Sequence, residues 1–431
     1  MYAAGRGLCK YESLINFFAK WYIQTRLPVL YCHRKIIREV HAIMQGRSAV
    51  LFLVDDRYRT GSEAPLMLHP VMGVPLLKWL THALCRAGVN RFFLACAQEF
   101  SESATACFPA DASLTNASDD DPADRLHVFL STAPDGEEDV LVVTGPVLYL
   151  PNCRAAGSGP ANACMIARRD LMSALDETVP IGRFLARAGD ACTRDDGFFS
   201  VSQPEDLPDW QPLLTASCLR ALHAAGVEIW DFANTYVEPG VEVGIGTVLL
   251  PGTVLQGSTR IGCGCTIGPN TRVIDSAIGN HAVVEQSRLE GVQVGNHAQV
   301  GPFANLRPGA ALEAQTKAGA FVELKNTHLG TGAKVPHLSY LGDAQVGENV
   351  NVGCGSVTAN FDRVQKLPTV IEKDAFLGCN TTLVAPVTVG QGAYVGAGSV
   401  ITEDIPAQAL ALGRARQQNK KEWALRNKKG E

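Results

Sequence analysis

The sequence lacks the cysteine patterns of disulfide-rich and zinc-binding proteins. Its 13 cysteines are scattered singly, apart from Cys263 and Cys265, and none forms a Cys-x-x-Cys pair. Single cysteines of this kind argue for reduced thiols in a cytosol rather than for a disulfide framework or a zinc site. We therefore expect a cytoplasmic protein without a structural metal.

Long hydrophobic runs and strong charge are also missing. No apolar run approaches the roughly 18 residues that a membrane-spanning helix needs. Charged residues make up 19% of the chain and its net charge is −5, which gives no reason to expect nucleic acid or a membrane surface as a partner. With 46% hydrophobic residues, the 431-residue chain has enough material for the cores of two or three domains.

Residues 1–43 differ from the rest of the chain in being basic, with seven Lys or Arg against two Glu. A basic segment with few acids is typical of a transit peptide. Met44, however, stands just before the first clear strand pattern at residues 49–54, so the segment is also explained as an extension of the gene model. We favour the second interpretation.

Residues 49–230 alternate strand-like and helix-like patterns. Short apolar runs, such as those at residues 49–54 and 139–145, are typical of buried strands, whereas residues 74–88 carry apolar side chains at helical spacing. This alternation predicts an α/β domain over residues 44–230 with a mostly parallel sheet.

From residue 235 onward, an aliphatic residue followed by glycine recurs at steps near six. The period is first clear at Val243-Gly244 and continues to Val395-Gly396. Such a period predicts a parallel β-helix over residues 235–413, in which each step supplies one short strand and three strands complete a coil. The basic segment at residues 414–431 has the composition of a solvated tail.

Two segments of this region depart from the period. It loosens at residues 324–343 and breaks at residues 357–370, where polar, aromatic and charged side chains gather. A purely structural rod needs no such interruptions, and loops on a rigid scaffold are where binding sites usually lie. His337, in the stretch KVPHLSYLGD, is therefore a candidate catalytic residue, although an isolated histidine is more often an ordinary surface residue.

Four motifs within this region carry a resemblance to a known family. They are VGPFANLRPGA at 300–310, FVELKN at 321–326, HLSYLGDAQVGENVNVGCGSVTANFD at 337–362 and TTLVAPVTVGQGAYVGAGSVI at 381–401. The chain here resembles the acetyltransferase half of the bacterial bifunctional N-acetylglucosamine-1-phosphate uridyltransferase and glucosamine-1-phosphate N-acetyltransferase family. The resemblance implies a left-handed β-helix of hexapeptide repeats, a homotrimer with active sites between subunits, and acetyl-CoA as cosubstrate.

The resemblance also implies roles for individual side chains. His337 corresponds to the general base that takes the proton from the attacking sugar amine, and a histidine with an ordinary pKa of about 6.5 suits this task at neutral pH. Glu323 corresponds to the partner that orients the imidazole. The substrate-binding residues implied are Arg307, Lys325 and Lys366 for the phosphate, and Tyr340 and Asn351 for the sugar and its amine.

Five positions correspond to acetyl-CoA contacts. Asn360 matches a contact to the acetyl and pantetheine portion, Ala397 a backbone contact to coenzyme A, and Arg414 a contact to its phosphates. Phe361 stands where a tyrosine is common, and Cys379 where a serine is common. We expect both replacements to be tolerated, because one keeps the aromatic ring and the other keeps a small polar side chain.

The first domain resembles the Rossmann-like nucleotidyltransferase domain of the family in outline but lacks its chemistry. Residues 64–80 match a family segment, yet LVDDRYRTG at residues 53–61 replaces the glycine-rich loop that approaches nucleotide phosphates. The positions of the phosphate-binding lysine and of the two magnesium ligands fall at or near Leu66, Pro146 and Ser202. Because magnesium needs oxygen ligands, we expect the uridyltransferase activity to be lost, and magnesium to be needed only if that activity survives.

The resulting hypothesis is a bacterial, cytoplasmic, trimeric N-acetyltransferase of UDP-N-acetylglucosamine biosynthesis that feeds cell-wall peptidoglycan synthesis. Three alternatives stay open: a full bifunctional enzyme with a divergent nucleotide site, a non-catalytic assembly or regulatory subunit, and an acetyltransferase for another amino-sugar acceptor. In the first domain, the alternatives are a solvated surface, which we favour, and a new acidic site made of Asp55, Asp56, Glu63 and residues 193–199.

Overall fold

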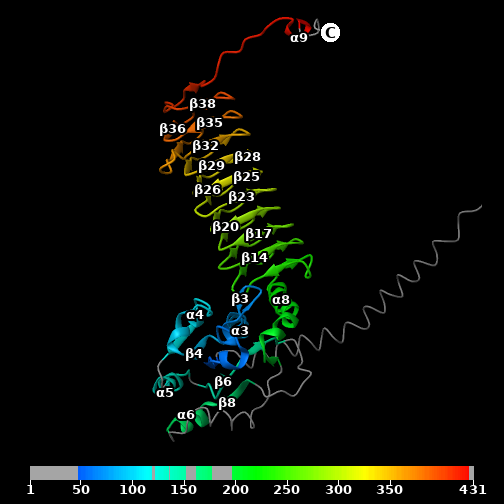
Figure 1. Ribbon diagram of the computed structural model, residues 1–431, viewed down its shortest axis with the longest axis vertical. Coiled ribbons are helices and arrows are strands. Elements are labelled where there is room, and N and C mark those ends of the chain that lie inside the picture. Colours follow the sequence, from blue (N-terminus) through cyan, green and yellow to red (C-terminus); the bar gives the residue numbers. More distant parts are fainter. Residues whose placement is uncertain (1–46, 119–121, 135, 152–161, 177–196, 427–431) are drawn as a thin grey trace, which may run out of the picture. The chain divides into compact units, whose positions relative to one another are not determined.

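The computed structural model describes residues 47–118, 122–134, 136–151, 162–176 and 197–426 (Figure 1). The basic extension at residues 1–43 lies outside these described residues. The chain divides into two compact units, Met1–Ser217 and Cys218–Glu431. No helix among the described residues is long and apolar enough to cross a membrane.

The first unit is built on a five-stranded sheet with the strand order β5-β4-β1-β6-β8. Its strands are β1 (Ser48–Phe52), β4 (Arg91–Ala95), β5 (Ser113–Ala117), β6 (Asp139–Val143) and β8 (Ala163–Ala167). All neighbouring pairs are parallel except β6 with β8. The expected Rossmann-like sheet is confirmed, and the direction in which strands are added reverses at β1, between β4 and β6.

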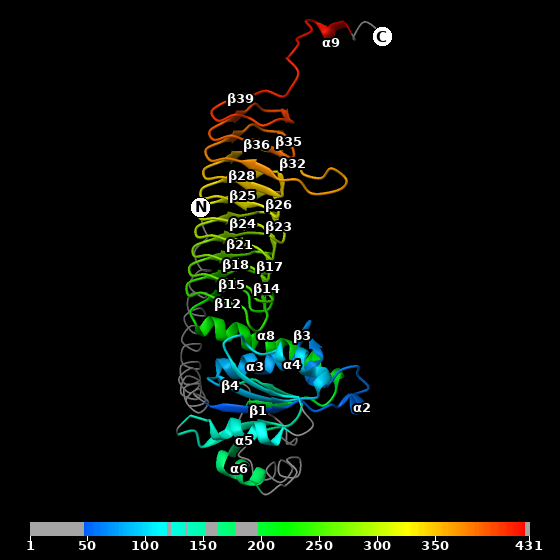
Figure 2. The same cartoon turned by 90° about the vertical axis from the view of Figure 1, so that its left-hand side faces the viewer.

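Helices cover both faces of this sheet (Figure 2). α3 (Leu76–Arg86) lies on one face, and α5 (Ala123–Ser131) and α6 (Arg168–Asp176) lie on the other. Leu126 and Leu171 from the latter two helices are fully buried in one cluster with valines of β1 and β6. Burial of each leucine contributes about 1.5–3 kcal/mol to the stability of this packing.

Two connections lie at the carboxyl ends of the central strands. β1 leads into α2 (Arg57–Thr60). β6 leads into β7 (Val147–Tyr149), which pairs in the antiparallel direction with β9 (Phe198–Ser200). Because β1 and β6 are parallel neighbours, these connections meet at the same edge of the sheet.

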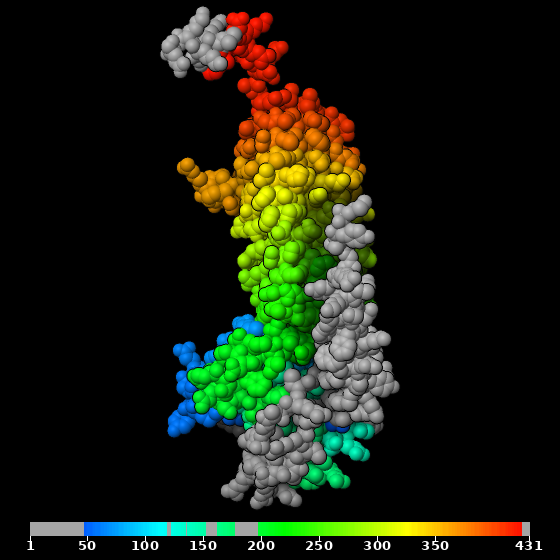
Figure 3. Space-filling model, turned by 90° about the vertical axis from the view of Figure 1, so that its right-hand side faces the viewer, coloured from blue at the N-terminus to red at the C-terminus, as the bar shows by residue number. Residues whose placement is uncertain are grey.

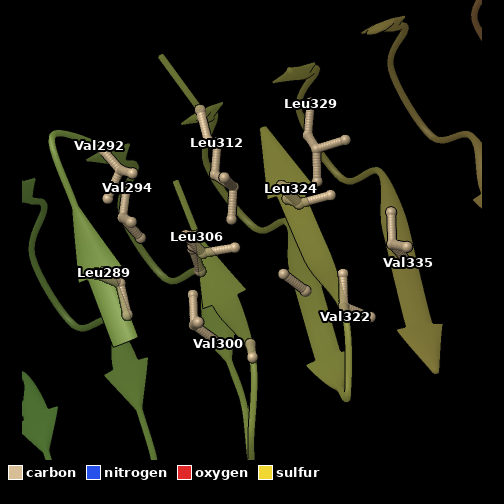
Figure 4. Packing of buried hydrophobic residues seen from close by; sticks show 14 of the residues in the cluster. Leu289, Val292, Val294, Val300, Leu306, Leu312, Val322, Leu324, Leu329 and Val335 are labelled. Atoms are coloured by element: carbon tan, nitrogen blue, oxygen red, sulfur yellow. The ribbon is translucent and has the colours of Figure 1, made fainter. Parts of the chain in front are cut away.

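The second unit is a parallel β-helix whose three sheets have 11, 10 and 9 strands. Almost every strand pairs with the third strand after it, as β23 (Asn305–Leu306) does with β26 (Glu323–Lys325), and β26 with β29 (Tyr340–Gly342). Leu306 and Leu324 are in register and fully buried, and Figure 4 shows them among the aliphatic side chains inside the coil. The architecture matches the predicted left-handed β-helix of hexapeptide repeats.

The β-helix begins earlier than the glycine pattern indicates. Its first strand is β10 (Glu228–Ile229), ahead of the predicted start at residue 235. The preceding helix α8 (Leu207–Ala224) contributes Leu219 to the same hydrophobic cluster as the coil strands. The division between the two units, after Ser217, therefore falls inside α8. A helix that packs on the first coils has no six-residue period, so the pattern could not reveal it.

One of the two expected interruptions leaves the coil. Residues 360–368 form a loop between β32 (Val357–Ala359) and β33 (Thr369–Ile371) that projects from the surface (Figure 2, Figure 3). Residues 324–343, by contrast, stay within the coil: β28 (Lys334–His337) and β29 keep their register with the strands before and after them. β28 has four residues, whereas most strands of the coil have two or three.

Candidate active site

Four of the predicted site residues lie on one outer sheet surface of the β-helix. Glu323 and Tyr340 are directly paired in the ladder of β26 and β29. Arg307 follows β23, and its backbone N–H bonds to the carbonyl of Leu324, so it stands one coil before Lys325. Since alternate residues of a strand point to the same face, all four side chains share the solvent side of this sheet.

Arg307 and Glu323 form an ion pair on this surface. Arg307 Nη1 donates a hydrogen bond to Glu323 Oε1 at 3.0 Å, and the two side chains are 45% and 38% exposed. Among the described residues, no hydrogen bond or ion pair joins Glu323 to His337. The role of Glu323 as the partner of the imidazole therefore stays a prediction.

His337 is the last residue of β28 and lies exposed at a corner of the coil, in register with Ala320. Leu338 turns the chain with a φ of 49°, and the Ser339 hydroxyl bonds back to the His337 carbonyl at 2.8 Å. Tyr340 then starts the strand of the next sheet. No residue that the structure describes forms a hydrogen bond with the imidazole, so both ring nitrogens are open to a ligand.

Asn360 belongs to a polar network next to this surface. Its Nδ2 donates to Asp343 Oδ2 at 2.5 Å, and Asn326 Nδ2 donates to Asp343 Oδ1 at 2.7 Å. Asn360 is only 5% exposed. A Cβ atom added to Gly342 would collide with the Tyr340 hydroxyl and with Asn360 Nδ2, so both side chains occupy the space beside this glycine. Sequence reasoning did not identify Asp343 or Asn326, which have the residue types of ordinary turns.

The loop at residues 360–368 carries two more predicted residues. Lys366 Nζ lies 4.2 Å from the centre of the exposed Phe361 ring, and the backbones of these two residues form an isolated bridge. The N–H of Leu367 bonds to the Asn360 carbonyl at 2.9 Å. A backbone hydrogen bond thus joins the base of the loop to Asn360, and the ammonium group of Lys366 lies over the ring of Phe361.

The remaining four predicted residues lie apart from this group. Asn351 belongs to β31 (Asn351–Val352) on the same sheet as β28, where it is in register with Lys334. Cys379 and Ala397 are exposed at coil corners nearer the C-terminus, and Arg414 is exposed beyond the last strand. Within the described chain, no hydrogen bond or ion pair joins them to Arg307, Glu323 or Tyr340.

The first unit has a pocket of about 420 Å³ at the carboxyl ends of β1 and β6. Pockets of open α/β sheets form at such a reversal of strand order. The lining side chains include Asp56, Arg59, Pro146, Asn162 and Ser202. Three of the positions singled out by the family resemblance, at residues 56, 146 and 202, therefore meet at one pocket.

The charges around this pocket are paired. The carboxylate of Asp56 accepts the backbone N–H of Leu66 at 2.8 Å and the Arg59 guanidinium at 3.0 Å. Arg59 also donates to the Ser202 carbonyl at 2.6 Å. These contacts pair the charge of Asp56, engage both of its carboxylate oxygens and hold Arg59 across the pocket.

The other acidic residues near this pocket either form ion pairs or do not line it. Arg57 binds both Asp55 and Glu99 at 2.7 Å, and its guanidinium holds the pKa of the Asp55 carboxyl below the usual value. Glu63 does not line the pocket. The part of the chain that the structure describes holds no group of three or more His, Cys, Asp or Glu side chains suited to a metal. Of the loop at residues 193–199, the first four residues lie outside the described residues.

The second unit shares its repeat pattern with transferases of the hexapeptide class. Residues 368–403 match the family model described as bacterial transferase hexapeptide (six repeats). The proteins named bifunctional protein GlmU share 54% identity over 201 residues in Exiguobacterium sp. and 50% over 206 residues in Thermotoga maritima. These matches cover 47% and 48% of this chain, and 45% and 46% of the relatives.

The resemblance to the bifunctional enzymes is thus confirmed, and the chain spans somewhat less than half the length of the curated relatives it matches. Among solved structures, an Arabidopsis UDP-N-acetylglucosamine acyltransferase aligns with a TM-score of 0.29 and 15% identity, over 43% of this chain and 69% of that one. The polysialic acid acetyltransferase NeuO aligns with a TM-score of 0.20 and 15% identity, over 42% and 84%.

Proposed function

We propose that the β-helical unit is a glucosamine-1-phosphate N-acetyltransferase that uses acetyl-CoA. The observation that carries this proposal is the identity of 50–54% to GlmU proteins over 201–206 residues. The reaction yields N-acetylglucosamine-1-phosphate and coenzyme A, in the bacterial cytoplasm, as a step toward UDP-N-acetylglucosamine and peptidoglycan.

The proposed step is direct acyl transfer. The amine nitrogen of the sugar attacks the thioester carbonyl carbon, a C–N bond forms, and the C–S bond breaks with departure of the coenzyme A thiolate, which takes up the proton that the amine has released. The amine must lose a proton as it attacks, and His337 accepts it. The open ring nitrogens of His337 and its exposed position support this role, and a positioned base contributes about 10²–10⁴-fold in rate.

The phosphate of the acceptor is bound by Arg307, Lys325 and Lys366 in this proposal. Arg307 and Lys325 occupy equivalent positions on successive coils, one directly beside the other, which suits two contacts to a single phosphate. Tyr340, which is in register with Glu323 on the same sheet surface, binds the sugar. Phosphate competes with Glu323 for Arg307, and the released Glu323 carboxylate is then available to orient the His337 imidazole.

Acetyl-CoA binding and the trimer are proposed together. In this proposal Cys379, Ala397 and Arg414 bind acetyl-CoA, whereas Asn351 binds the sugar and its amine. All four residues lie apart from the Arg307 surface of the same chain, so a neighbouring subunit supplies them to a shared site. An exposed apolar column beside His337 supports subunit packing: Phe303 and Phe321 stack with ring centres 5.2 Å apart and are 51% and 58% exposed. Leu338, 58% exposed, continues that column.

The first unit, in our proposal, has lost uridyltransferase activity. The paired charges of Asp56 and Arg59, and the lack of a side-chain oxygen at Pro146, support this view. The test is release of pyrophosphate from UTP and N-acetylglucosamine-1-phosphate with magnesium. Turnover that depends on magnesium would show the full bifunctional enzyme instead.

The acetyltransferase proposal is tested by thiol release from acetyl-CoA, with the sugar product identified by mass spectrometry. We expect release only when glucosamine-1-phosphate is added, together with a product heavier by one acetyl group. Release with glucosamine or another unphosphorylated amino sugar at equal efficiency would favour a different acceptor. No release with any amino sugar would favour a non-catalytic assembly or regulatory subunit.

A further inference from the structure

Asp343 stands at the corner where β29 ends, between two coils that carry site residues. Its backbone has a φ of 52°, and its N–H bonds to the Lys325 carbonyl at 3.0 Å. The side chain accepts hydrogen bonds at both oxygens, from Asn326 at 2.7 Å and from Asn360 at 2.5 Å. One carboxylate thereby joins three successive coils.

This carboxylate fixes the orientation of the Asn360 amide. An ionised carboxylate can only accept hydrogen bonds, so Asn360 must turn its NH₂ group toward Asp343 and its carbonyl oxygen away. Rotation of the Asn360 amide by half a turn would place its carbonyl oxygen against the Asp343 carboxylate, so that two acceptors face each other. Because Asn360 is only 5% exposed, water could not replace the lost hydrogen bond. The amide therefore has one allowed orientation rather than two.

The carbonyl oxygen of Asn360 is the atom left for a ligand. None of the described residues donates to Asn360 Oδ1, and this oxygen is not fully enclosed by protein. Beside it, Gly342 leaves room for both the Asn360 amide and the Tyr340 hydroxyl. A molecule at this point meets a hydrogen-bond acceptor held in place by Asp343.

We propose that Asp343 is a positioning residue that makes Asn360 an obligate acceptor for an amide N–H of the pantetheine arm. The inference rests on the proposed function. The thioester carbonyl has no N–H, so an acceptor at Asn360 cannot polarise it, whereas the pantetheine arm carries amide N–H groups. Asp343 thus contributes to the binding of acetyl-CoA rather than to the chemical step.

A reciprocal exchange of the two side chains tests this assignment. In Asp343→Asn, the introduced amide has one acceptor oxygen, so it can bond to Asn326 and to Asn360 together only if the side-chain amide of one of them rotates by half a turn. We expect the Kd and the KM for acetyl-CoA to rise about tenfold, the effect of losing one hydrogen bond, while kcat changes less than about twofold. Asn360→Asp alone sets two carboxylates in contact and should weaken acetyl-CoA binding at least as much.

The double variant Asp343→Asn with Asn360→Asp restores every bond, because the amide introduced at position 343 donates to the carboxylate at position 360 and accepts from Asn326. It also keeps an acceptor oxygen facing the ligand, so we expect Kd and KM to return to within about threefold of the wild-type values. The matched control is Asp374→Asn, since Asp374 lies at another corner with a φ of 60° and accepts from Asn349 at 3.3 Å. This control should leave acetyl-CoA binding unchanged.

Isothermal titration with acetyl-CoA, steady-state kinetics and thermal unfolding are measured on all four variants of the full chain. An unchanged Kd in Asp343→Asn would overturn the role of Asp343 but not the proposed function. The same holds for a double variant that folds with the wild-type Tm but binds acetyl-CoA no better than the single variants. A wild-type chain that does not bind acetyl-CoA would overturn the proposed function as well.

Discussion

Arg307 and Glu323 lie on neighbouring coils of the β-helix and form an ion pair with 3.0 Å between Arg307 Nη1 and Glu323 Oε1. Both side chains are more than one third exposed. Pairs of this kind contribute only about 0–1 kcal/mol to stability, so the pair does little for the fold. Its place beside Lys325 and Tyr340 agrees with the phosphate contact that we propose for Arg307.

Arg307→Gln is expected to raise the KM for glucosamine-1-phosphate about 10–100-fold, because a hydrogen bond to a charged group contributes about 1.5–3 kcal/mol. The free energy of unfolding should change by less than about 1 kcal/mol. The matched control is Arg288→Gln, which removes the similarly exposed pair of Arg288 with Glu290 at 2.6 Å. An equal rise in KM in both variants would contradict a specific phosphate contact at Arg307.

Gly342→Ala should impair catalysis more than folding. The added methyl group would collide with the Tyr340 hydroxyl and the Asn360 amide, so both must move. We expect kcat/KM to fall at least about tenfold, with a loss of about 1–3 kcal/mol of stability from the tighter packing. Ala282→Val, which overfills the fully buried core several coils away, is the control: it should lower the Tm and leave kcat/KM unchanged. Loss of activity in both variants to the same degree would refute a site at Gly342.

Arg414 and Arg416 provide a comparison within the basic tail. Both are exposed, but only Arg414 is expected to contact the phosphates of coenzyme A. Arg414→Gln should therefore raise the KM for acetyl-CoA by about tenfold or more, with kcat little changed, whereas Arg416→Gln should have no effect. Steady-state kinetics with acetyl-CoA as the varied substrate decides between specific contact and general electrostatic attraction, which would affect both variants.

The stability of the first unit should depend on the protonation of His82. Burial, helped by the charges of Arg86 and Lys78, lowers the pKa of His82 from 6.5 to about 4. Below about pH 6.5 the unfolded chain takes up a proton that the folded unit refuses, so stability is present above that pH and is lost as the pH falls toward 4. We expect a loss of about 1–2 kcal/mol between pH 7.5 and pH 5 in urea unfolding.

His82→Gln is expected to remove most of this pH dependence, because the amide does not titrate in that range. The corresponding variant of the more exposed His127, His127→Gln, should retain the wild-type dependence. A wild-type unit that is equally stable at pH 7.5 and pH 5 would show that His82 is not held neutral by burial.

The architecture of the β-helix could be predicted from the sequence because its periodicity is local. Each coil repeats an aliphatic residue and a glycine, so the buried positions of Leu306 and Leu324 follow from the spacing alone. The outward positions of Arg307 and Lys325 follow from the same alternation. The pattern did not reveal that α8 packs against the first coils, since that contact depends on helical periodicity.

The polar contacts between coils could not be predicted in this way. Asn326, Asp343 and Asn360 each have the residue type of a turn, and their bonds form only because one coil separates each from the next. Likewise, the sequence LVDDRYRTG suggested exposed negative charge, whereas Asp55 and Asp56 are paired with Arg57 and Arg59. The pairing of these charges depends on the direction of each side chain, and residue types alone do not determine that direction.

Thiol release by the wild type and by His337→Ala, measured side by side, decides whether His337 is the base of the acetyl transfer. We predict that His337→Ala lowers kcat about 10²–10⁴-fold with glucosamine-1-phosphate and acetyl-CoA, at an unchanged Tm. The control His328→Ala, which removes an imidazole bonded to Glu313 on another sheet, should keep kcat within about threefold. A His337→Ala enzyme that turns over at the wild-type rate would contradict the role of His337 as the base.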